Sequence, residues 1–227
     1  DAMANLVFAE ALSQSTFAGF IITVLVHTDM ASPHLHHAGT AAQKAKYMPR
    51  ITSGECITAV GVSEPGAGSD VAGIRTTAKR DGDHWVLNGT KAWITNGGIA
   101  NVHVVVAAVD PALKGRGQAS FVVPPNTKGL SQGQKYAKHG IKASHTAEVV
   151  LDDVRIPGSC LLGGKEKLDA KLARYREGGA SSGKQPAMAT FEATRPAVGA
   201  QALGVARAAY EIALDYAKER VAFGKPI

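Results

Sequence analysis

Two stretches of the sequence, at residues 60–70 and 91–98, decide the fold. The first reads Val-Gly-Val-Ser-Glu-Pro-Gly-Ala-Gly-Ser-Asp and the second Lys-Ala-Trp-Ile-Thr-Asn-Gly-Gly. Each is a short apolar strand that ends in a hydroxyl residue and then breaks into a glycine-rich turn. Strand backbone offers N–H and C=O groups in alternation, which suits the edge of a flat heterocycle that carries both donors and acceptors.

The side chains of these two stretches fit the same ligand. Ser63 and Thr95 would each add a hydroxyl at a strand end, and Trp93 would add an aromatic face. The glycines of 66–68 and 97–98 would let the backbone approach a ligand without a Cβ in the way.

Around these segments, from Cys56 to about Pro157, the chain is β-rich. Short apolar runs separated by Gly, Asp, Asn and Pro predict strands at 56–63, 73–80, 84–88, 91–95, 101–109, 119–124 and 147–155. Asp81-Gly82-Asp83 and Asn88-Gly89 are hairpin signals between adjacent strands. Seven strands joined by such turns predict an antiparallel barrel or sandwich.

Helical patterns lie on both sides of the β-rich region. On the N-terminal side we predict helices at 4–26 and 40–48, the second capped by Thr40 and stopped by Pro49. On the C-terminal side a charged helix at 165–176 and a polar linker at 178–183 precede a long helix that Pro196 either opens or kinks. Its apolar or small residues predict one buried face: 198, 202, 205, 209, 212, 213 and 216.

Composition narrows the class of protein. The 227 residues are 45% hydrophobic and 19% charged, as in ordinary globular proteins, and the ten-residue apolar run Phe17–Val26 is too short to span a membrane. No secretory signal is visible, and the isolated Cys56 and Cys160 fit a reducing compartment. The net charge of +6 is scattered rather than interleaved with aromatics, which favours an anionic small ligand over nucleic acid.

The two opening segments, in this order, resemble those that hold the flavin in the acyl-CoA dehydrogenase family, particularly its medium- and short-chain members. The resemblance implies an α+β fold: residues 1–54 in an N-terminal helical domain, 55–157 in a central flavin-binding β-domain, and 158–227 as a linker and the first helix of a C-terminal helical domain. It also implies that further helices precede and follow this chain.

The family's reaction is FAD-dependent α,β-dehydrogenation of an acyl-CoA thioester to the 2-enoyl-CoA, with hydride passing to flavin N5. By motif match, Val60 and Val62 line the flavin through their backbone and Ser63 through its hydroxyl. Trp93 lies against the ring and Thr95 near its redox edge, although a core tryptophan of a barrel is the alternative for Trp93.

A second group of matched residues would contact substrate or a neighbouring subunit. Ser69 and Ser144 match positions that contact CoA or FAD phosphates, and a turn serine is the alternative for each. In Phe-Glu-Ala-Thr-Arg-Pro, Glu192 and Thr194 match the acyl-CoA site and Arg195 a buried supporting cation, against the alternative of a solvated helix end. Arg220 and Phe223 match the pair that reaches the FAD of a neighbouring subunit, which implies a homotetramer built as a dimer of dimers.

The general base is not among the matched residues. Relatives carry it late in the C-terminal domain or at the position of Thr194, and threonine cannot do that work. Glu192 lies two residues away and therefore points about 200° round a helix. We expect the base outside this sequence and predict no catalytic residue within it. His27, His34, His36 and His37 are predicted to be structural histidines of a loop rather than a zinc site, because no matching cysteine accompanies them.

Three related possibilities remain open. An acyl-CoA oxidase or a flavin monooxygenase shares this fold, and a catalytically silent flavin-binding fragment is a third reading. The resemblance also implies electron-transfer flavoprotein as the electron acceptor, and the bacterial cytoplasm or the mitochondrial matrix as the location. Acyl chain length is not predictable from these residues.

Overall fold

The N-terminal part of the chain is helical. The computed structural model describes residues 2–178 and 186–227. Helix α1 (Ala2–Leu12) is followed by an almost continuous helical stretch made of α2 (Ala18–Leu25), the π-helix η1 (Val26–Ala31) and α3 (Ser32–Ala38). The single helix predicted at 4–26 is therefore wrong, since the chain turns at 13–17. The predicted histidine loop is wrong too, because these histidines lie on η1 and α3.

Helix α4 (Ala41–Thr52) begins as predicted but ends later. The Thr40 side chain accepts a hydrogen bond from Gln43 N, and the Gln43 side chain accepts one from Thr40 N, so both free donors are satisfied. Pro49 lies inside the helix, one turn from its end, instead of stopping it. It removes one backbone donor there, while its own carbonyl still accepts from Ser53 N at 3.1 Å.

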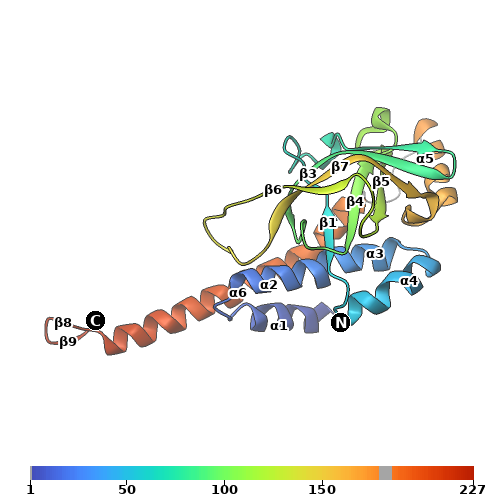
Figure 1. The fold of residues 1–227 in the computed structure, drawn as a ribbon. Helices are drawn as coiled ribbons and strands as arrows, with labels where there is room; N and C mark the ends of the chain where they lie inside the picture. Colours follow the sequence, from blue (N-terminus) through green and yellow to red (C-terminus); the bar gives the residue numbers. More distant parts are fainter. Residues whose placement is uncertain (1, 179–185) are drawn as a thin grey trace.

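The central part of the chain is one curled, mixed sheet (Figure 1). Its strand order is β1-β4-β2-β3-β7-β6, with β5 paired to β4. β1 and β2 run parallel to β4 and the other pairings are antiparallel, so the all-antiparallel sheet that the turns predicted is wrong in this respect. The strands are β1 (Thr58–Gly61), β2 (Thr77–Asp81), β3 (His84–Thr95), β4 (Val102–Ala108), β5 (Gln118–Val123), β6 (Leu130–Lys135) and β7 (Thr146–Pro157).

Two features of this sheet differ from the sequence prediction. The Asp81-Gly82-Asp83 hairpin is confirmed, but the predicted strands 84–88 and 91–95 form one strand, β3, with no turn at Asn88-Gly89. β6 has no counterpart among the predicted strands. Its sequence Leu-Ser-Gln-Gly-Gln-Lys lacks the apolar alternation of a half-buried strand, and most of its side chains are exposed.

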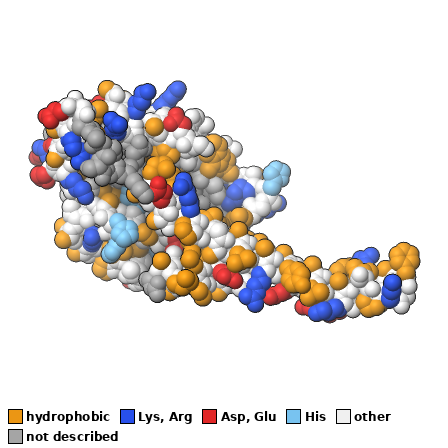
Figure 2. Space-filling model, turned by 180° about the vertical axis from the view of Figure 1, so that it is seen from behind, with side chains coloured by type: hydrophobic (Ala, Val, Ile, Leu, Met, Phe, Trp, Pro, Cys, Tyr) orange, Lys and Arg blue, Asp and Glu red, His pale blue; other side chains and the backbone are white. Residues whose placement is uncertain are grey.

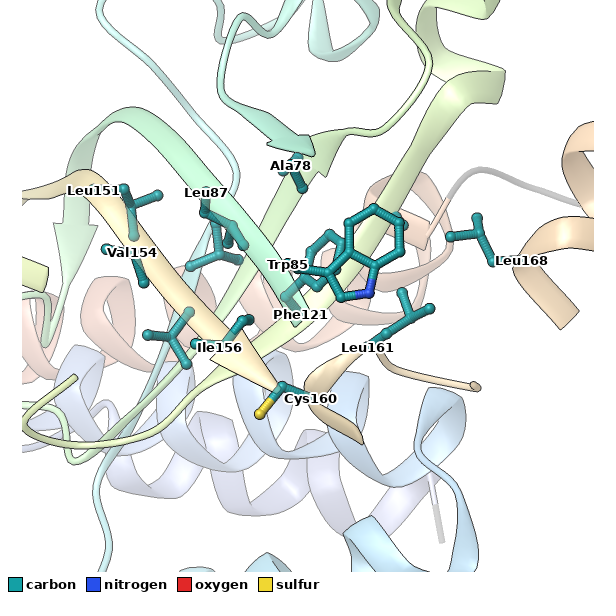
Figure 3. Packing of buried hydrophobic residues seen from close by; sticks show 14 of the residues in the cluster. Ala78, Trp85, Leu87, Phe121, Leu151, Val154, Ile156, Cys160, Leu161 and Leu168 are labelled. Atoms are coloured by element: carbon teal, nitrogen blue, oxygen red, sulfur yellow. The ribbon is translucent and has the colours of Figure 1, made fainter. Parts of the chain in front are cut away.

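The largest hydrophobic core lies on one face of the sheet (Figure 3). Trp85 of β3 packs edge-on against Phe121 of β5, with ring centroids 5.2 Å apart. Helix α5 (Lys165–Arg176), at the bounds predicted for it, adds Leu168 and Leu172 to this cluster. The core thus fixes β3 against β4 and β5, and β3 carries the second of the two opening segments.

Helix α6 (Pro186–Glu219) begins beside the sheet, crosses α1 and then projects beyond the body (Figure 1). The hairpin β8 (Val221–Ala222) and β9 (Lys225–Pro226) lies at its far end. Pro196 lies within the helix and does not open it. Of the linker predicted at 178–183, residues 179–183 lie outside the described residues. In the described part of the chain, no helix is long and apolar enough to cross a membrane.

All seven residues of the predicted buried face of α6 are exposed. Ala197 and Gly204 are buried, where the helix packs on α1 and α2. Beyond them the helix leaves the body, and hydrophobic side chains gather along its projecting part (Figure 2). Along the whole helix, the exposed large hydrophobic residues are Val198, Leu203, Val205, Tyr210, Ile212, Leu214 and Tyr216. Nothing in the described chain covers them, which is why the prediction is wrong here.

Candidate functional site

The two opening segments meet at one hollow of about 120 Å³. Five residues predicted to hold a ligand line it together: Val60, Val62, Ser63, Trp93 and Thr95. Four others were not predicted: Val26 and Met30 from η1, Ile94 from β3, and Phe191 from α6. The hollow therefore lies where the helical part, the sheet and α6 meet, a junction that sequence periodicity could not reveal.

Hydrogen bonds fix the two segments side by side. The backbone N–H of Ala92 donates to Ser63 O at 2.9 Å. The buried ammonium of Lys91 donates to Val62 O at 3.0 Å and to Glu64 Oε1 at 2.8 Å. The wall of the hollow is thus held by one backbone and two side-chain bonds.

A β-bulge turns Trp93 out of the sheet. Between the pairs Lys91–Val149 and Ile94–Ala147, two residues of β3 face the single residue Glu148 of β7. Trp93 takes the left-handed conformation with φ 57°, which is uncommon outside glycine, and its side chain is 54% exposed. The bulge therefore presents the indole at the rim of the hollow, and the alternative of a core tryptophan does not hold.

The exposed indole is supported on one side. Tyr136 stacks on it, with ring centroids 6.1 Å apart and planes 23° from parallel. The Tyr136 hydroxyl donates to Glu148 Oε1 at 3.2 Å, and Glu148 Oε2 accepts from Gln134 N at 3.0 Å. Burial and the Glu148 carboxylate raise the pKa of Tyr136, so the phenol stays neutral as a donor. The sequence motif does not identify this support, because Tyr136 lies 43 residues beyond Trp93.

Asn96 joins the sheet to the helical part. It is buried, has φ 64°, and its amide nitrogen donates to Thr23 O at 3.2 Å and to Thr58 O at 3.3 Å. Asparagine tolerates the left-handed conformation better than most side chains. This residue of the motif therefore has a structural task that no prediction assigned to it.

The glycines of the two segments do different work. A Cβ at Gly66 or Gly68 would meet no protein atom within 4 Å, so the fold itself does not require glycine there, and the approach of a ligand stays a prediction. A Cβ at Gly97 would lie 2.9 Å from Ile94 O, and one at Gly98 would overlap the side chains of Gln132 and His145. Glycine at 97–98 is therefore required by the packing of the protein itself, and the approach of a ligand to this backbone stays a prediction.

The first turns of α6 lie beside the hollow through Phe191. Thr194 is buried, and its hydroxyl donates to Phe191 O at 3.1 Å. Glu192 is half-buried. Arg195 is exposed, so the prediction of a buried cation is wrong for this chain, since its side chain lies on the solvent face of α6.

Four predicted residues lie away from the lining of the hollow. Ser69 is exposed in the turn after Glu64, and Ser144 is buried where the Cα of Gly19 in α2 approaches closely. Arg220 and Phe223 lie at the β8–β9 hairpin, at the far end of α6 from the hollow (Figure 1). The Arg220 guanidinium lies over the Tyr216 ring at 5.7 Å, and Phe223 is fully exposed.

The histidines make structural contacts. His27 Nδ1 lies 2.8 Å from Thr58 Oγ1, and His34 lies between Ser120 Oγ and Thr190 Oγ1, each at 2.9 Å. Burial lowers the pKa of His34 to about 4, so its ring is neutral. Among residues 2–178 and 186–227, no group of three His, Cys, Asp or Glu side chains could hold a metal ion.

A larger space lies on the other side of η1. A cavity of about 520 Å³ lies between α1, η1 and α6, with Phe8, Asp29 and Ala193 among its lining residues. Burial raises the pKa of Asp29, against hydrogen bonds from Thr28 and Asn5. π-Helical turns often occur at functional sites, so η1 marks this region as a candidate site. The sequence alone did not predict the π-helix.

Family models match almost the whole chain. A model of the acyl-CoA dehydrogenase N-terminal domain matches residues 1–55, the middle domain 59–154, and the C-terminal domain 181–227. The mitochondrial short-chain specific acyl-CoA dehydrogenase of Bos taurus is 43% identical over 189 residues, which are 83% of this chain and 42% of that protein.

Solved structures agree with this match. Butyryl-CoA dehydrogenase from Megasphaera elsdenii is 35% identical with a TM-score of 0.88, covering 100% of this chain and 55% of that one. A structure described as the electron transferring flavoprotein of Acidaminococcus fermentans is 33% identical with the same TM-score, covering 100% and 55%. This chain spans about half the length of the curated relatives it matches. It belongs to the acyl-CoA dehydrogenase family.

Proposed function

We propose that this chain is the flavin-binding part of an FAD-dependent acyl-CoA dehydrogenase. The observation that carries the proposal is the hollow, where an exposed aromatic face, two hydroxyls and the backbone of two strand ends converge. The indole is held in the left-handed conformation by a bulge and supported by Tyr136 on one side, and its side chain stays 54% exposed. Stacking on a flat ring is the interaction that such a face offers.

The residues of the hollow offer the chemical groups that a flavin ring would need. Val60 and Val62 would present backbone groups to the ring edge, and the half-buried hydroxyls of Ser63 and Thr95 would add hydrogen bonds. The flavin, when bound, supplies the acceptor for hydride from the substrate β-carbon. The protein's task is to hold the ring and the acyl chain in contact and to exclude water.

Substrate contacts are assigned to the neighbouring segments. The half-buried Glu192 and the buried Thr194 lie next to Phe191, which lines the hollow, and they would face the acyl-CoA there. Ser69 and Ser144 are the proposed contacts to CoA or FAD phosphates. Arg195, exposed in this chain, would support the substrate site only if another segment covers it.

We place the general base outside residues 1–227. Thr194 has no carboxylate, and Glu64 is engaged by Lys91 and two backbone N–H groups. Substrate deprotonation at the α-carbon needs a carboxylate in reach and donors on the thioester oxygen.

Electrons then leave through a protein partner, for which an electron-transfer flavoprotein is the proposed class. We also propose a homotetramer in which Arg220 and Phe223 contact the FAD of a neighbouring subunit. The β8–β9 hairpin, beside which both residues lie, is at the far end of α6 from the sheet, and this supports that arrangement (Figure 1). The two buried free thiols support a reducing compartment, the bacterial cytoplasm or the mitochondrial matrix.

Flavin analysis of the full-length protein tests the proposal. We expect denaturation to release FAD, and we expect a panel of acyl-CoA thioesters to bleach the bound flavin anaerobically.

The double variant S63A/T95V should weaken FAD binding at least about tenfold, since each hydroxyl bond contributes on the order of 1 kcal/mol. The exposed Ser131 of β6 provides a matched control in S131A. Recovery of FMN, or of no flavin from folded protein, contradicts the proposal. Rapid reoxidation by O₂ after bleaching would identify an oxidase instead.

A further inference from the structure

A buried lysine stands directly behind the hollow without any role in the proposed chemistry. Lys91 of β3 is 0% exposed, and it is the largest of the fully buried side chains in the described chain. Buried charges are costly unless they are paired and hydrogen-bonded. Its place in the sequence, two residues before Trp93, puts it at the start of the bulge that presents the indole.

The ammonium of Lys91 ties together three segments. It donates to Val62 O at 3.0 Å, which belongs to the first wall of the hollow, and to Glu64 Oε1 at 2.8 Å. Glu64 is itself held by the backbone N–H groups of Arg75 at 2.6 Å and Thr76 at 2.9 Å. Lys91 therefore connects β3 with the end of β1 and with the segment that leads into β2.

Both charges are maintained in this environment. Burial lowers the pKa of Lys91 to about 8, against the opposing effect of the Glu64 carboxylate. Burial would raise the pKa of Glu64, but the Lys91 charge and the hydrogen bonds lower it overall. The pair is therefore ionic at neutral pH. A charged ammonium binds the Val62 carbonyl more strongly than a neutral amine would.

The stem of Lys91 is fixed as tightly as its head. It passes over Gly61, where a Cβ would lie 3.1 Å from Lys91 Cγ. The buried Gly61 thus leaves the space that the lysine stem fills between β3 and its partners Val62 and Glu64. Apolar residues of similar volume often stabilise a fold as well as a buried ion pair does, so stability alone does not require this arrangement.

We propose that Lys91 is a positioning residue, whose ion pair with Glu64 and bond to Val62 O align the 60–63 backbone and the Trp93 bulge for flavin binding. The inference rests on the proposed function. It states that the pair determines the shape of the flavin site rather than the stability of the fold. The two effects are separable by experiment.

The variants are K91M, which keeps the stem volume and removes the charge, and K91M/E64Q, which also removes the carboxylate left behind. The exposed Lys79 of β2 provides the matched control K79M. In the full-length protein we expect K91M to lower both the melting temperature and FAD affinity, the latter at least about tenfold. K91M/E64Q should regain much of the melting temperature, because no uncompensated charge remains, but not the FAD affinity. K79M should change neither by more than about twofold.

If FAD affinity falls in K91M and recovers in K91M/E64Q together with the melting temperature, the proposal is overturned, since Lys91 would then act on stability alone. Hydrogen exchange of the flavin-free proteins supplies a second readout. Faster exchange at 60–64 and 92–93 in K91M/E64Q than in K79M supports the proposal, and unchanged exchange there contradicts it. If K91M does not fold, G61A, which displaces the lysine stem but keeps its charge, should lower FAD affinity in the same way. An unsubstituted protein that binds no flavin would instead show that the proposed function has failed.

Discussion

At the scale of single residues, the site depends on side chains that stand in environments unusual for their type. Trp93 is exposed, whereas Lys91, Glu64 and Asn96 are buried. A large exposed aromatic residue and a buried charge are both informative, because each opposes the ordinary partition between surface and core. Here they adjoin one another, and the buried polar groups hold the backbone that presents the exposed ring.

His34 gives a pH-dependent prediction at the same scale. Its neutral ring bridges Ser120 of β5 and Thr190 of α6, and burial lowers its pKa from 6.5 to about 4. A lowered pKa means that the folded state binds the proton less readily than the unfolded state. The contribution of His34 is therefore complete above pH 6.5 and is lost as the pH falls toward 4, by up to about 3 kcal/mol.

Denaturant unfolding at pH 7.5 and pH 4.5 measures this effect. We expect H34Q to lose less free energy of unfolding between these two values than the unsubstituted protein does. The exposed His139 supplies the matched control, H139Q, which should keep the full pH dependence. An equal loss in H34Q and the unsubstituted protein would show that other groups, such as the buried His103, carry the acid sensitivity.

Single site residues were predictable only where a motif names them. Ser63, Trp93 and Thr95 were found because a hydroxyl or an indole at a strand end suggests a ligand. Lys91 and Asn96 belong to the same motif, yet their partners Val62, Thr23 and Thr58 become visible only in the folded chain, where the sheet meets helix α2. Phe191 begins the matched motif Phe-Glu-Ala-Thr-Arg-Pro, but its place in the hollow, on a helix about 100 residues further along the chain, was not predicted.

At the scale of elements, β3 shows why turn signals mislead. Asn-Gly favours a two-residue hairpin, but here Gly89 has φ 145° and lies within a continuous strand. A second bulge faces it on β7, where Asp153 takes φ 47° and exchanges two hydrogen bonds of 2.9 Å with the Asn88 side chain. Tertiary pairing with β7 therefore outweighs the local preference for a turn.

Gly89→Ala tests this reading of β3. A Cβ there would lie 2.8 Å from Thr76 Cα in a conformation that L side chains rarely adopt. We expect the free energy of unfolding to fall by at least about 2 kcal/mol. Gly140→Ala, where no atom lies within 4 Å, should change it by less than about 0.5 kcal/mol. Chemical denaturation of both variants provides the measurement, and equal stabilities would mean that the Asn88–Gly89 segment forms an adaptable turn.

Elements with strong periodicity or clear caps were predicted well, and those determined by packing were not. α5 has the predicted bounds and α4 the predicted cap, because the signals lie in their own sequences. β6 is a strand because β7 offers it an edge, which no local pattern indicates. The π-helix η1 contributes residues to both the hollow and the neighbouring cavity, and no sequence pattern predicted it.

At the scale of the whole molecule, α6 is the outlier. The helix exposes Leu203, Tyr210, Ile212 and Tyr216, and the segment after its far end contains Arg220 and Phe223. Figure 2 shows hydrophobic side chains along the projecting part of the helix. Large exposed apolar patches on a protein mark sites of interaction with another surface. The order of helices, sheet and helix was predictable from the sequence, but the exposure of α6 was not, because it depends on which described residues pack against the helix.

Arg220 gives the prediction that belongs to this scale. In our proposal its guanidinium binds the FAD pyrophosphate in the hollow of a neighbouring subunit. Removing a bidentate charged contact should weaken FAD binding by about 2–4 kcal/mol, or roughly 30- to 1000-fold, in R220A. Arg50 has an exposed partner in Glu55, so R50A serves as the control and should bind FAD within about threefold of the parent.

Mixing two defective subunits distinguishes a contact in trans from one in cis. The first subunit carries R220A, and the second carries S63W, which fills its hollow but keeps its Arg220. If Arg220 acts across an interface, a mixed dimer contains one complete site: the intact hollow of the first subunit and the arginine of the second. Random re-association at equal amounts should then restore tight FAD binding to about one quarter of the sites.

If mixing restores no tight binding while R220A alone is still defective, the contact lies within one chain. The projecting α6 would then have to fold back to its own hollow. Affinity in R220A within threefold of the parent would leave Arg220 as a surface charge and remove the main support for the proposed arrangement of subunits.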